Sequence, residues 1–102
     1  MITFDQFKEI ELRAAKIISA ERVEGSDKLL KLAVSVGDEN RQIIAGIGKR
    51  YDPTTLIGRQ IVIAANLEPR MLMGLESQGM LLAADTAQGP VLLCPSEEVP
   101  AG

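Results

Sequence analysis

The stretch from Leu30 to Val36 constrains the fold most, because large apolar side chains alternate along it with small or polar ones. In an extended strand, alternate side chains lie on the same face, so one face would carry Leu30, Leu32, Val34 and Val36 toward the protein interior. This period of two is typical of a β-strand with one buried face and does not fit a helix. The Gly37-Asp38-Glu39-Asn40 run that follows predicts a tight reversal, with Arg41 to Ile47 as the hairpin partner.

Most of the remaining segments also favour strands. Leu12 to Val23 predicts a long first strand whose alternation breaks midway, which indicates a bend or bulge. Thr3 to Glu9 predicts one brief helix capped by Thr3, and Asp52 before Pro53 predicts one or two helical turns that stop at Gly58. Three further strands are expected at the following apolar runs: Gln60 to Ala65, Met80 to Ala84 and Val91 to Cys94.

This order of elements predicts an all-β fold, a five-stranded Greek-key OB-fold barrel. It would carry short N-terminal and connecting helices and extra C-terminal strands. A β-sandwich is the alternative that the pattern leaves open. At 102 residues the chain has the usual size of one domain, so a single domain over residues 1–102 is expected.

Composition excludes most catalytic chemistry. Histidine is absent and Cys94 is the only cysteine, so an ordinary zinc site and an internal disulfide are excluded, and no cofactor or metal is expected. Leu92 and Leu93 beside Cys94 favour a buried structural thiol. A hydrolase built on Ser77 with Lys49 lacks a base partner, so no enzyme activity is expected. No segment is apolar enough to span a membrane and no leader is evident, which predicts a cytoplasmic protein.

The charge distribution matters more than the net charge of −3. Residues 41–70 carry five basic and two acidic side chains, a local charge of +3 within an acidic chain. A phosphate backbone responds to one face of a protein rather than to its total charge. Only three aromatic residues are present, so base stacking cannot dominate, and a folded RNA read by its backbone and shape fits better than a single strand.

The segment from Asn66 to Met80 is the most distinctive one, because it lacks strand alternation and lies between two apolar strands. Arg70 is a candidate for phosphate contact, Asn66 and Ser77 for hydrogen bonds to sugar or phosphate oxygens, and Met80 for apolar contact. The alternative is structural: the apolar residues plug the barrel end, Asn66 and Ser77 cap backbone groups, and Met80 belongs to the core.

Lys28, Arg41 and Lys49, together with Arg50, flank the second and third predicted strands and are candidates for a phosphate-tracking surface, or for an ordinary solvated one. Gly46-Ile47-Gly48-Lys49 does not make a nucleotide phosphate loop, because the first glycine and the final Ser or Thr of that motif are missing.

Several ordered blocks carry a resemblance to a known family, over nearly the whole chain. The chain resembles the tRNA-binding domain found at the C-terminus of many bacterial methionyl-tRNA synthetases, as a beta subunit in others, and in free-standing structure-specific tRNA-binding proteins. The blocks are Glu11-Leu12-Arg13, Gly25-Ser26-Asp27-Lys28-Leu29, Arg41 to Ile47, Leu56-Ile57-Gly58, Ala65 to Arg70 and Glu76 to Ala84.

The resemblance implies an OB-fold homodimer that grips the outer corner of tRNA, in cis or in trans with a methionyl-tRNA synthetase catalytic domain, and performs no chemistry itself. The family's tRNA-contacting positions map onto Asn66, Ser77 and Met80, with basic support expected at Lys28, Lys49 and Arg70. Glu68 and Met73 depart from the family, since many relatives carry Lys or Arg there.

The acidic net charge and Glu68 favour an alternative: a dimerisation or protein-interaction module with weak RNA affinity, like the secretion-chaperone relatives of this fold. The sequence does not decide which tRNAs would be preferred. It also leaves open whether the chain is a whole protein or a piece of a longer synthetase.

Overall fold

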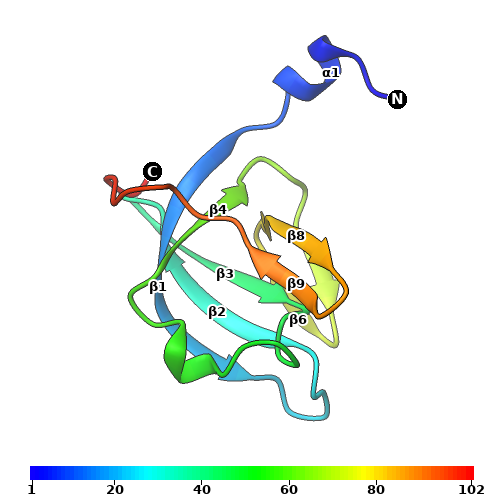
Figure 1. Cartoon of the computed structure of the whole chain (residues 1–102), viewed down its shortest axis with the longest axis vertical. Helices are drawn as coiled ribbons and strands as arrows, with labels where there is room; N and C mark the ends of the chain where they lie inside the picture. The colour runs from blue at the N-terminus through cyan, green and yellow to red at the C-terminus, as the bar shows by residue number, and fades with distance from the viewer.

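Five strands form one antiparallel sheet that curls into a nearly closed barrel (Figure 1). The computed structural model describes residues 1–102. The strands lie in the order β3-β2-β1-β4-β7. Their bounds are Leu12–Arg22 for β1, Leu30–Ser35 for β2, Asn40–Ala45 for β3, Gln60–Ala64 for β4 and Met80–Leu81 for β7. The predicted five-stranded OB-like barrel is confirmed.

Strand β1 is long because it serves both halves of the sheet. Its first part pairs with β4 and its second part with β2, and Lys16 has a partner in each, Gln60 and Ser35. The pairing with β2 shifts register between Ile17 and Ser19. A bulge of this kind bends a strand and increases its twist, so the predicted bend is confirmed and explains how one strand closes a small barrel.

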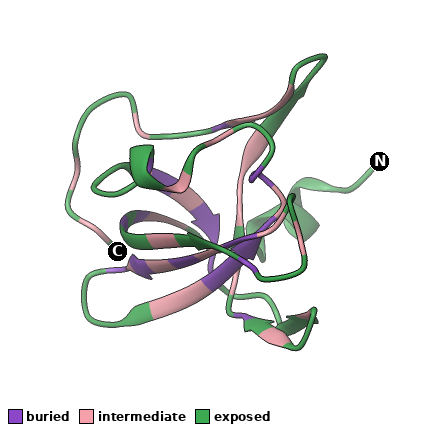
Figure 2. Cartoon of the chain, turned by 90° about the horizontal axis from the view of Figure 1, so that it is seen from below, coloured by how far each residue is buried: buried purple, intermediate pink, exposed green.

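The alternating apolar side chains of β2 line the barrel interior. Leu30, Leu32 and Val34 are fully buried, while the residues between them are only partly covered. Figure 2 shows the same buried stripe running along the neighbouring strands. The other large, fully buried side chains are Ile17, Val36, Ile43, Leu56, Ile61 and Ile63. The sequence period therefore translates directly into one core.

The two helical segments form where their caps were predicted. Helix α1, Phe4–Lys8, begins at Thr3 with a capping box between Thr3 and Gln6, and η1, Pro53–Thr55, is capped by Asp52. Helix α1 buries none of its residues and extends away from the barrel (Figure 1). No helix has the length and apolar character needed to cross a membrane.

Two small hairpins complete the fold, and they correct the sequence prediction. β5 is Arg70–Leu72, β6 is Leu75–Ser77, β8 is Ala83–Thr86 and β9 is Gly89–Leu92. The segment after Asn66, expected to lack strands, therefore contains the β5–β6 hairpin. The single strand expected over Met80 to Ala84 is split at Leu82, whose N–H donates to the Val62 carbonyl oxygen at 2.9 Å and whose carbonyl accepts from the Leu93 N–H.

The prediction that Cys94 is a buried thiol is wrong. Strand β9 ends at Leu92, which is buried, and the chain then leaves the sheet. Leu93 is 44% exposed and Cys94 is also exposed. Of the two apolar neighbours that favoured burial, Leu92 is the last residue of the strand and Leu93 already lies outside it, so neither predicts the environment of Cys94.

Candidate nucleic-acid interface

The β5–β6 hairpin is built around a two-residue turn. Leu72 pairs with Leu75, and both intervening residues, Met73 and Gly74, have positive φ, 49° and 78°. Positive φ at both central positions defines the type I′ turn, whose twist matches that of the flanking strands. Glycine suits this turn, whereas Met73 is the only residue other than glycine with positive φ in the chain.

Side chains from the end of this hairpin form hydrogen bonds with the backbone groups along the edge of β3. The Gln42 N–H donates to Gln78 Oε1 at 2.9 Å and the Ile44 N–H donates to Ser77 Oγ at 3.0 Å, while the Gln78 N–H donates to the Gln42 carbonyl at 2.7 Å. These are the backbone groups that an edge strand normally leaves unpaired. The hairpin is therefore fixed to the barrel by polar side chains.

Ser77 is held inside this junction. It is 4% exposed, and its hydroxyl accepts from Ile44 and donates to the Gly79 carbonyl oxygen at 2.9 Å. Gly79 in turn lies so close to the barrel that an added Cβ would come within 3.1 Å of both the Ala64 carbonyl oxygen and the Ile43 side chain. The Ser77 hydrogen bonds and the close approach of Gly79 fix the short connection between β6 and β7 against the barrel.

Arg41 and Asn66 anchor the other end of the segment. The Arg41 guanidinium donates to the Ala65 carbonyl, lies 3.4 Å from the Gln78 carbonyl oxygen, and pairs with Glu39 at 2.7 Å. The Asn66 amide donates to the Glu9 carbonyl oxygen at 2.6 Å and accepts from the Glu11 N–H at 2.8 Å. Each of the two side chains thus makes at least two hydrogen bonds within the protein.

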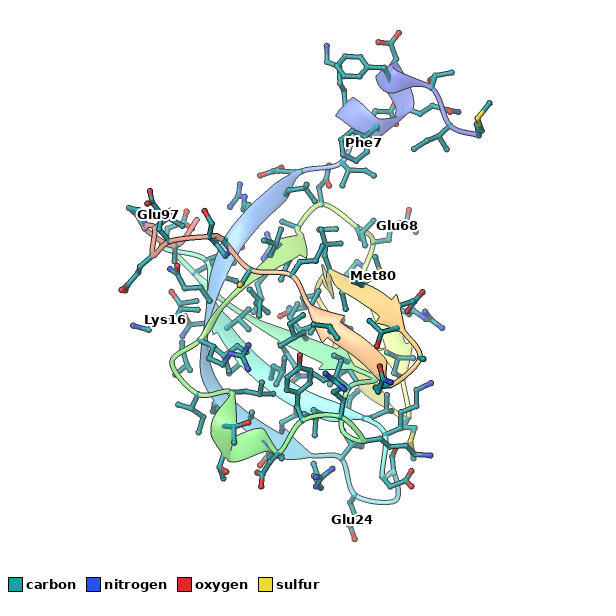
Figure 3. All side chains as sticks on the ribbon, in the orientation of Figure 1. Phe7, Lys16, Glu24, Glu68, Met80 and Glu97 are labelled. Atoms are coloured by element: carbon teal, nitrogen blue, oxygen red, sulfur yellow. The ribbon has the colours of Figure 1, made fainter.

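A hollow of about 420 Å³ opens between the hairpin and the barrel. It is lined by Ile44, Leu67, Glu68, Arg70, Leu72, Ser77, Gly79 and Met80. Met80 is 54% exposed and is therefore not a core residue. Figure 3 shows Met80 and Glu68 on the same side of the barrel, beside the loop that follows β4.

Charge at this hollow comes from two residues of opposite sign. Arg70 is exposed and forms no ion pair, although Glu68 also lines the hollow. An unpaired guanidinium beside an apolar surface can contact a phosphate while its neighbours contact an apolar group. Glu68 opposes that contact by repulsion, because it carries the same charge as a phosphate.

Lys28 and Lys49 lie apart from the hollow, beyond the opposite end of β3 from Arg41. Strand β3 ends at Ala45, and the Lys28 stem runs beside Gly46. Lys49 is exposed and its Nζ lies 3.8 Å from Asp27. The structure therefore brings Arg70, Ser77 and Met80 together, uses Arg41 and Asn66 as anchors, and separates the two lysines from them.

Sequence reasoning missed the residues that hold the hairpin in place. Gln42 and Gln78 look like ordinary polar residues in the sequence, yet both hold the hairpin against β3, and Gln42 also donates to the Glu76 carbonyl at 2.8 Å. Ile44 was expected in a strand, but not in the wall of a hollow outside the barrel. Only the position of Gln78 within the Glu76-Ser77-Gln78-Gly79 block gave a signal.

No group of three or more His, Cys, Asp or Glu residues is placed to hold a metal ion. Asp52 lies outside the hollow, immediately before η1. The hydrogen bonds from the Thr54 side chain and backbone N–H lower the pKa of that carboxyl. The Ser77 hydroxyl contacts only backbone groups, and Lys49 contacts Asp27, so the two do not form a nucleophile and base pair.

Comparison with known proteins gives one consistent family. The family described as "putative tRNA binding domain" matches residues 12–102. The chain is 58% identical, over its full length of 102 residues, to a methionine–tRNA ligase of Methanothrix thermoacetophila. That match covers 15% of the ligase, so the chain spans less than a sixth of this curated relative.

Solved structures of similar size share the fold. A MetRS-related protein from Pyrococcus horikoshii superposes with a TM-score of 0.92 at 36% identity, covering all of this chain and 94% of that one. The chaperone CsaA from Bacillus anthracis superposes with a TM-score of 0.91 at 34% identity, covering all of this chain and 96% of that one.

Proposed function

The chain belongs to the putative tRNA binding domain family, and from that premise we propose that it is a non-catalytic module that binds folded tRNA at the outer corner of the molecule. It acts in the cytoplasm, in cis or in trans with the catalytic domain of a methionine–tRNA ligase. Its contribution is affinity for tRNA, since recognition of shape and backbone needs no reacting group.

The observation that carries this proposal is the hollow beside Arg70. A rigid hairpin, fixed to β3 by Ser77 and Gln78, holds an unpaired guanidinium next to an apolar wall. The Arg70 guanidinium has no ion-pair partner within the protein, so it is free to form two hydrogen bonds to a phosphate. The apolar wall contributes only where a sugar or base is held against it, which favours RNA of fixed shape.

The candidate residues divide into three roles. Arg70 contacts phosphate and Met80 contacts a sugar or base within the hollow. Ser77, Asn66 and Arg41 act as positioning residues, because their polar groups are engaged with the protein backbone. Lys28 and Lys49 add electrostatic attraction from the far end of β3.

Titration with folded tRNA tests the proposal. Arg70→Glu and Lys49→Glu should each weaken binding across all tRNA species, with the larger loss at Arg70, because each reverses a charge that faces phosphate. Lys16→Glu is the matched control, since Lys16 points away from the barrel on β1 (Figure 3). Affinity unchanged by Arg70→Glu at low salt would contradict the proposed site, as would equal affinity for an unfolded strand of the same composition.

We also propose that the chain forms a homodimer through its N-terminal segment. Phe4 is 74% exposed, Phe7 is 48% exposed, and α1 buries none of its residues against its own barrel. Ile2 and Leu12, which precede and follow α1 in the sequence, are also exposed. Sedimentation of wild type and Phe7→Glu tests it: the variant should sediment as a monomer, and a wild type that is monomeric at micromolar concentration would exclude the dimer.

A second function is favoured by the same hollow. The likeness to a CsaA chaperone and the negative charge of Glu68 suit an apolar peptide rather than RNA. Glu68→Lys separates the two functions. Under the tRNA proposal it raises tRNA affinity, because a repulsive charge becomes attractive. Under the peptide proposal it leaves tRNA binding absent and alters the binding of fluorescent apolar peptides.

A further inference from the structure

A second group of arginines lies away from the hollow, around Tyr51. The Arg59 guanidinium carbon is 5.6 Å from the centre of the Tyr51 ring. Arg22 donates to the Gly48 carbonyl oxygen at 2.8 Å, and Arg50 approaches the Gln88 carbonyl oxygen at 3.4 Å. We call these four residues, Arg22, Arg50, Tyr51 and Arg59, the Tyr51 surface.

Each guanidinium of the Tyr51 surface is held by a neutral group. Tyr51 is itself fixed, because its hydroxyl accepts from the Leu92 N–H at 3.1 Å and its ring packs against the core. Arg59 therefore lies over an immobile ring. Arginines held in this way keep their charge unneutralised and lose little entropy when they bind an anion.

Two arginines outside the Tyr51 surface differ in this respect. Arg13 pairs with Glu11 and Arg41 pairs with Glu39, so their charges are largely compensated. The arginines of the Tyr51 surface form no ion pair within 4.0 Å. Two of the six arginines are therefore neutralised locally, whereas three of the four others contact only neutral groups.

Three acidic residues lie near these arginines, Asp52, Glu97 and Glu98, but none forms an ion pair with them. Asp52 accepts hydrogen bonds from the Thr54 hydroxyl at 2.8 Å and from its N–H at 3.0 Å, which together with the charge of Arg22 favour the ionised carboxylate. Glu97 and Glu98 line a hollow beside Arg59 but pair with no arginine. They limit the surface on that side.

We infer that the Tyr51 surface is a second contact for the phosphate backbone of RNA, separate from the hollow beside Arg70. The inference rests on the proposed tRNA binding and extends it. Guanidinium groups recognise phosphate through paired hydrogen bonds. The bases are not the target, because Arg59 covers one face of the Tyr51 ring and β9 holds its hydroxyl.

The two contacts lie at opposite ends of β4. Arg59 immediately precedes this strand and Asn66 follows it, so the strand between them spans roughly 13 Å at about 3.3 Å per residue. Figure 1 shows the connection between β3 and β4 at the end of the barrel opposite α1. A folded RNA that fills the hollow and also reaches the Tyr51 surface must lie along the barrel. Such an arrangement would select an RNA by its shape rather than by its sequence.

The double variant Arg50→Gln/Arg59→Gln tests the inference by titration with folded tRNA over a range of salt concentrations. Each lost phosphate contact lowers the slope of log K against log salt by about 0.7 to 0.9, so a fall of about 1.5 is expected, with about tenfold weaker binding at low salt. Arg13→Gln/Lys16→Gln removes the same charge from β1 and should change the slope by less than about 0.5.

A second measurement locates the contact on the RNA. In phosphate ethylation interference, the Arg50→Gln/Arg59→Gln variant should lose one set of interfering phosphates and Arg70→Gln another. Arg59→Lys keeps the charge but loses the paired hydrogen bonds and the stacking on Tyr51, so it should recover only part of the affinity that Arg59→Gln loses. Thermal unfolding of each variant confirms that the barrel remains folded.

The outcomes separate the two proposals. If the double variant matches the β1 control while Arg70→Gln weakens binding, tRNA binding stands and the Tyr51 surface is not a contact. If both arginine variants remove the same phosphates, the surface is not separate and the inference fails. If wild-type protein binds no tRNA at low salt, the proposed function itself fails.

Discussion

The barrel and the β5–β6 hairpin are neighbours held together by different forces. Strand β2 contributes Leu30, Leu32 and Val34 to the core through its alternating pattern. The hairpin is held on the other side of β3 by Ser77 and Gln78, whose partners lie more than thirty residues away. Apolar burial gives the barrel most of its stability, whereas a few directional hydrogen bonds determine where the hairpin lies.

Truncation of a core residue of the barrel should have the largest effect on the free energy of unfolding. Leu32→Ala leaves a cavity among fully buried neighbours and should lower the free energy of unfolding by about 2 to 5 kcal/mol. Urea denaturation measures it. Met71→Ala on the exposed face of the hairpin should stay within about 0.5 kcal/mol of wild type. Similar losses in the two variants would refute the distinction.

Ser77→Ala tests the hairpin side. It leaves the Ile44 N–H buried without an acceptor and should cost about 1 to 3 kcal/mol. Amide exchange should accelerate in Leu75, Glu76 and Ser77, with little change in β2. Ser96→Ala, at an exposed position, is the control. If exchange rises equally in β2 and the hairpin, the hairpin is not a separate unit.

Met73→Asn sharpens the comparison by stabilising the hairpin alone. Methionine is strained at a φ of 49°, and asparagine tolerates this conformation and is favoured before glycine in a type I′ turn. The free energy of unfolding of the variant should be higher than that of wild type by up to about 1 kcal/mol, as measured by thermal or urea denaturation. Met71→Asn, two residues away on a strand, should give no gain; a gain there would exclude the turn as the cause.

The smallest expected effect is on the pH dependence of stability, and it comes from Asp52 in the connection between β3 and β4. Hydrogen bonds from Thr54 lower the pKa of Asp52 in the folded state, so Asp52 stabilises the protein above its unfolded pKa. That contribution is lost as the pH falls through the lower, folded value. Asp52→Asn should therefore reduce the loss of stability below about pH 4, measured by thermal unfolding from pH 2 to 7. If the variant lost as much stability below about pH 4 as wild type does, Asp52 would not contribute to the acid sensitivity of the fold.

Much of the barrel could be predicted because its information is local. The caps at Thr3 and Asp52, the break in β1 and the alternation from Leu30 to Val36 each appear within a few consecutive residues, and each is confirmed. Cys94 shows the limit of such local reasoning. Its apolar neighbours predicted burial, but burial depends on where β9 ends.

The candidate site could be predicted only in part. The segment from Asn66 to Met80 and its Arg70 are visible in the sequence as a break between strands. Their arrangement is not, because it depends on Gln42 and Ile44, which lie on another strand. A polar residue that satisfies a distant backbone group looks in the sequence like any surface residue.

The sequence by itself determined the first four barrel strands, their buried faces and the absence of histidine chemistry, since side-chain period and composition act over short distances. Only the tertiary structure decided that Ser77 is buried, that Arg41 and Asn66 bond to backbone groups, and that Met80 lines a hollow beside Arg70. It also brought Arg22, Arg50 and Arg59 together around Tyr51. The physical reason is that hydrogen bonds and charge clusters require residues to meet in space, and barrel closure brings together residues far apart in the chain.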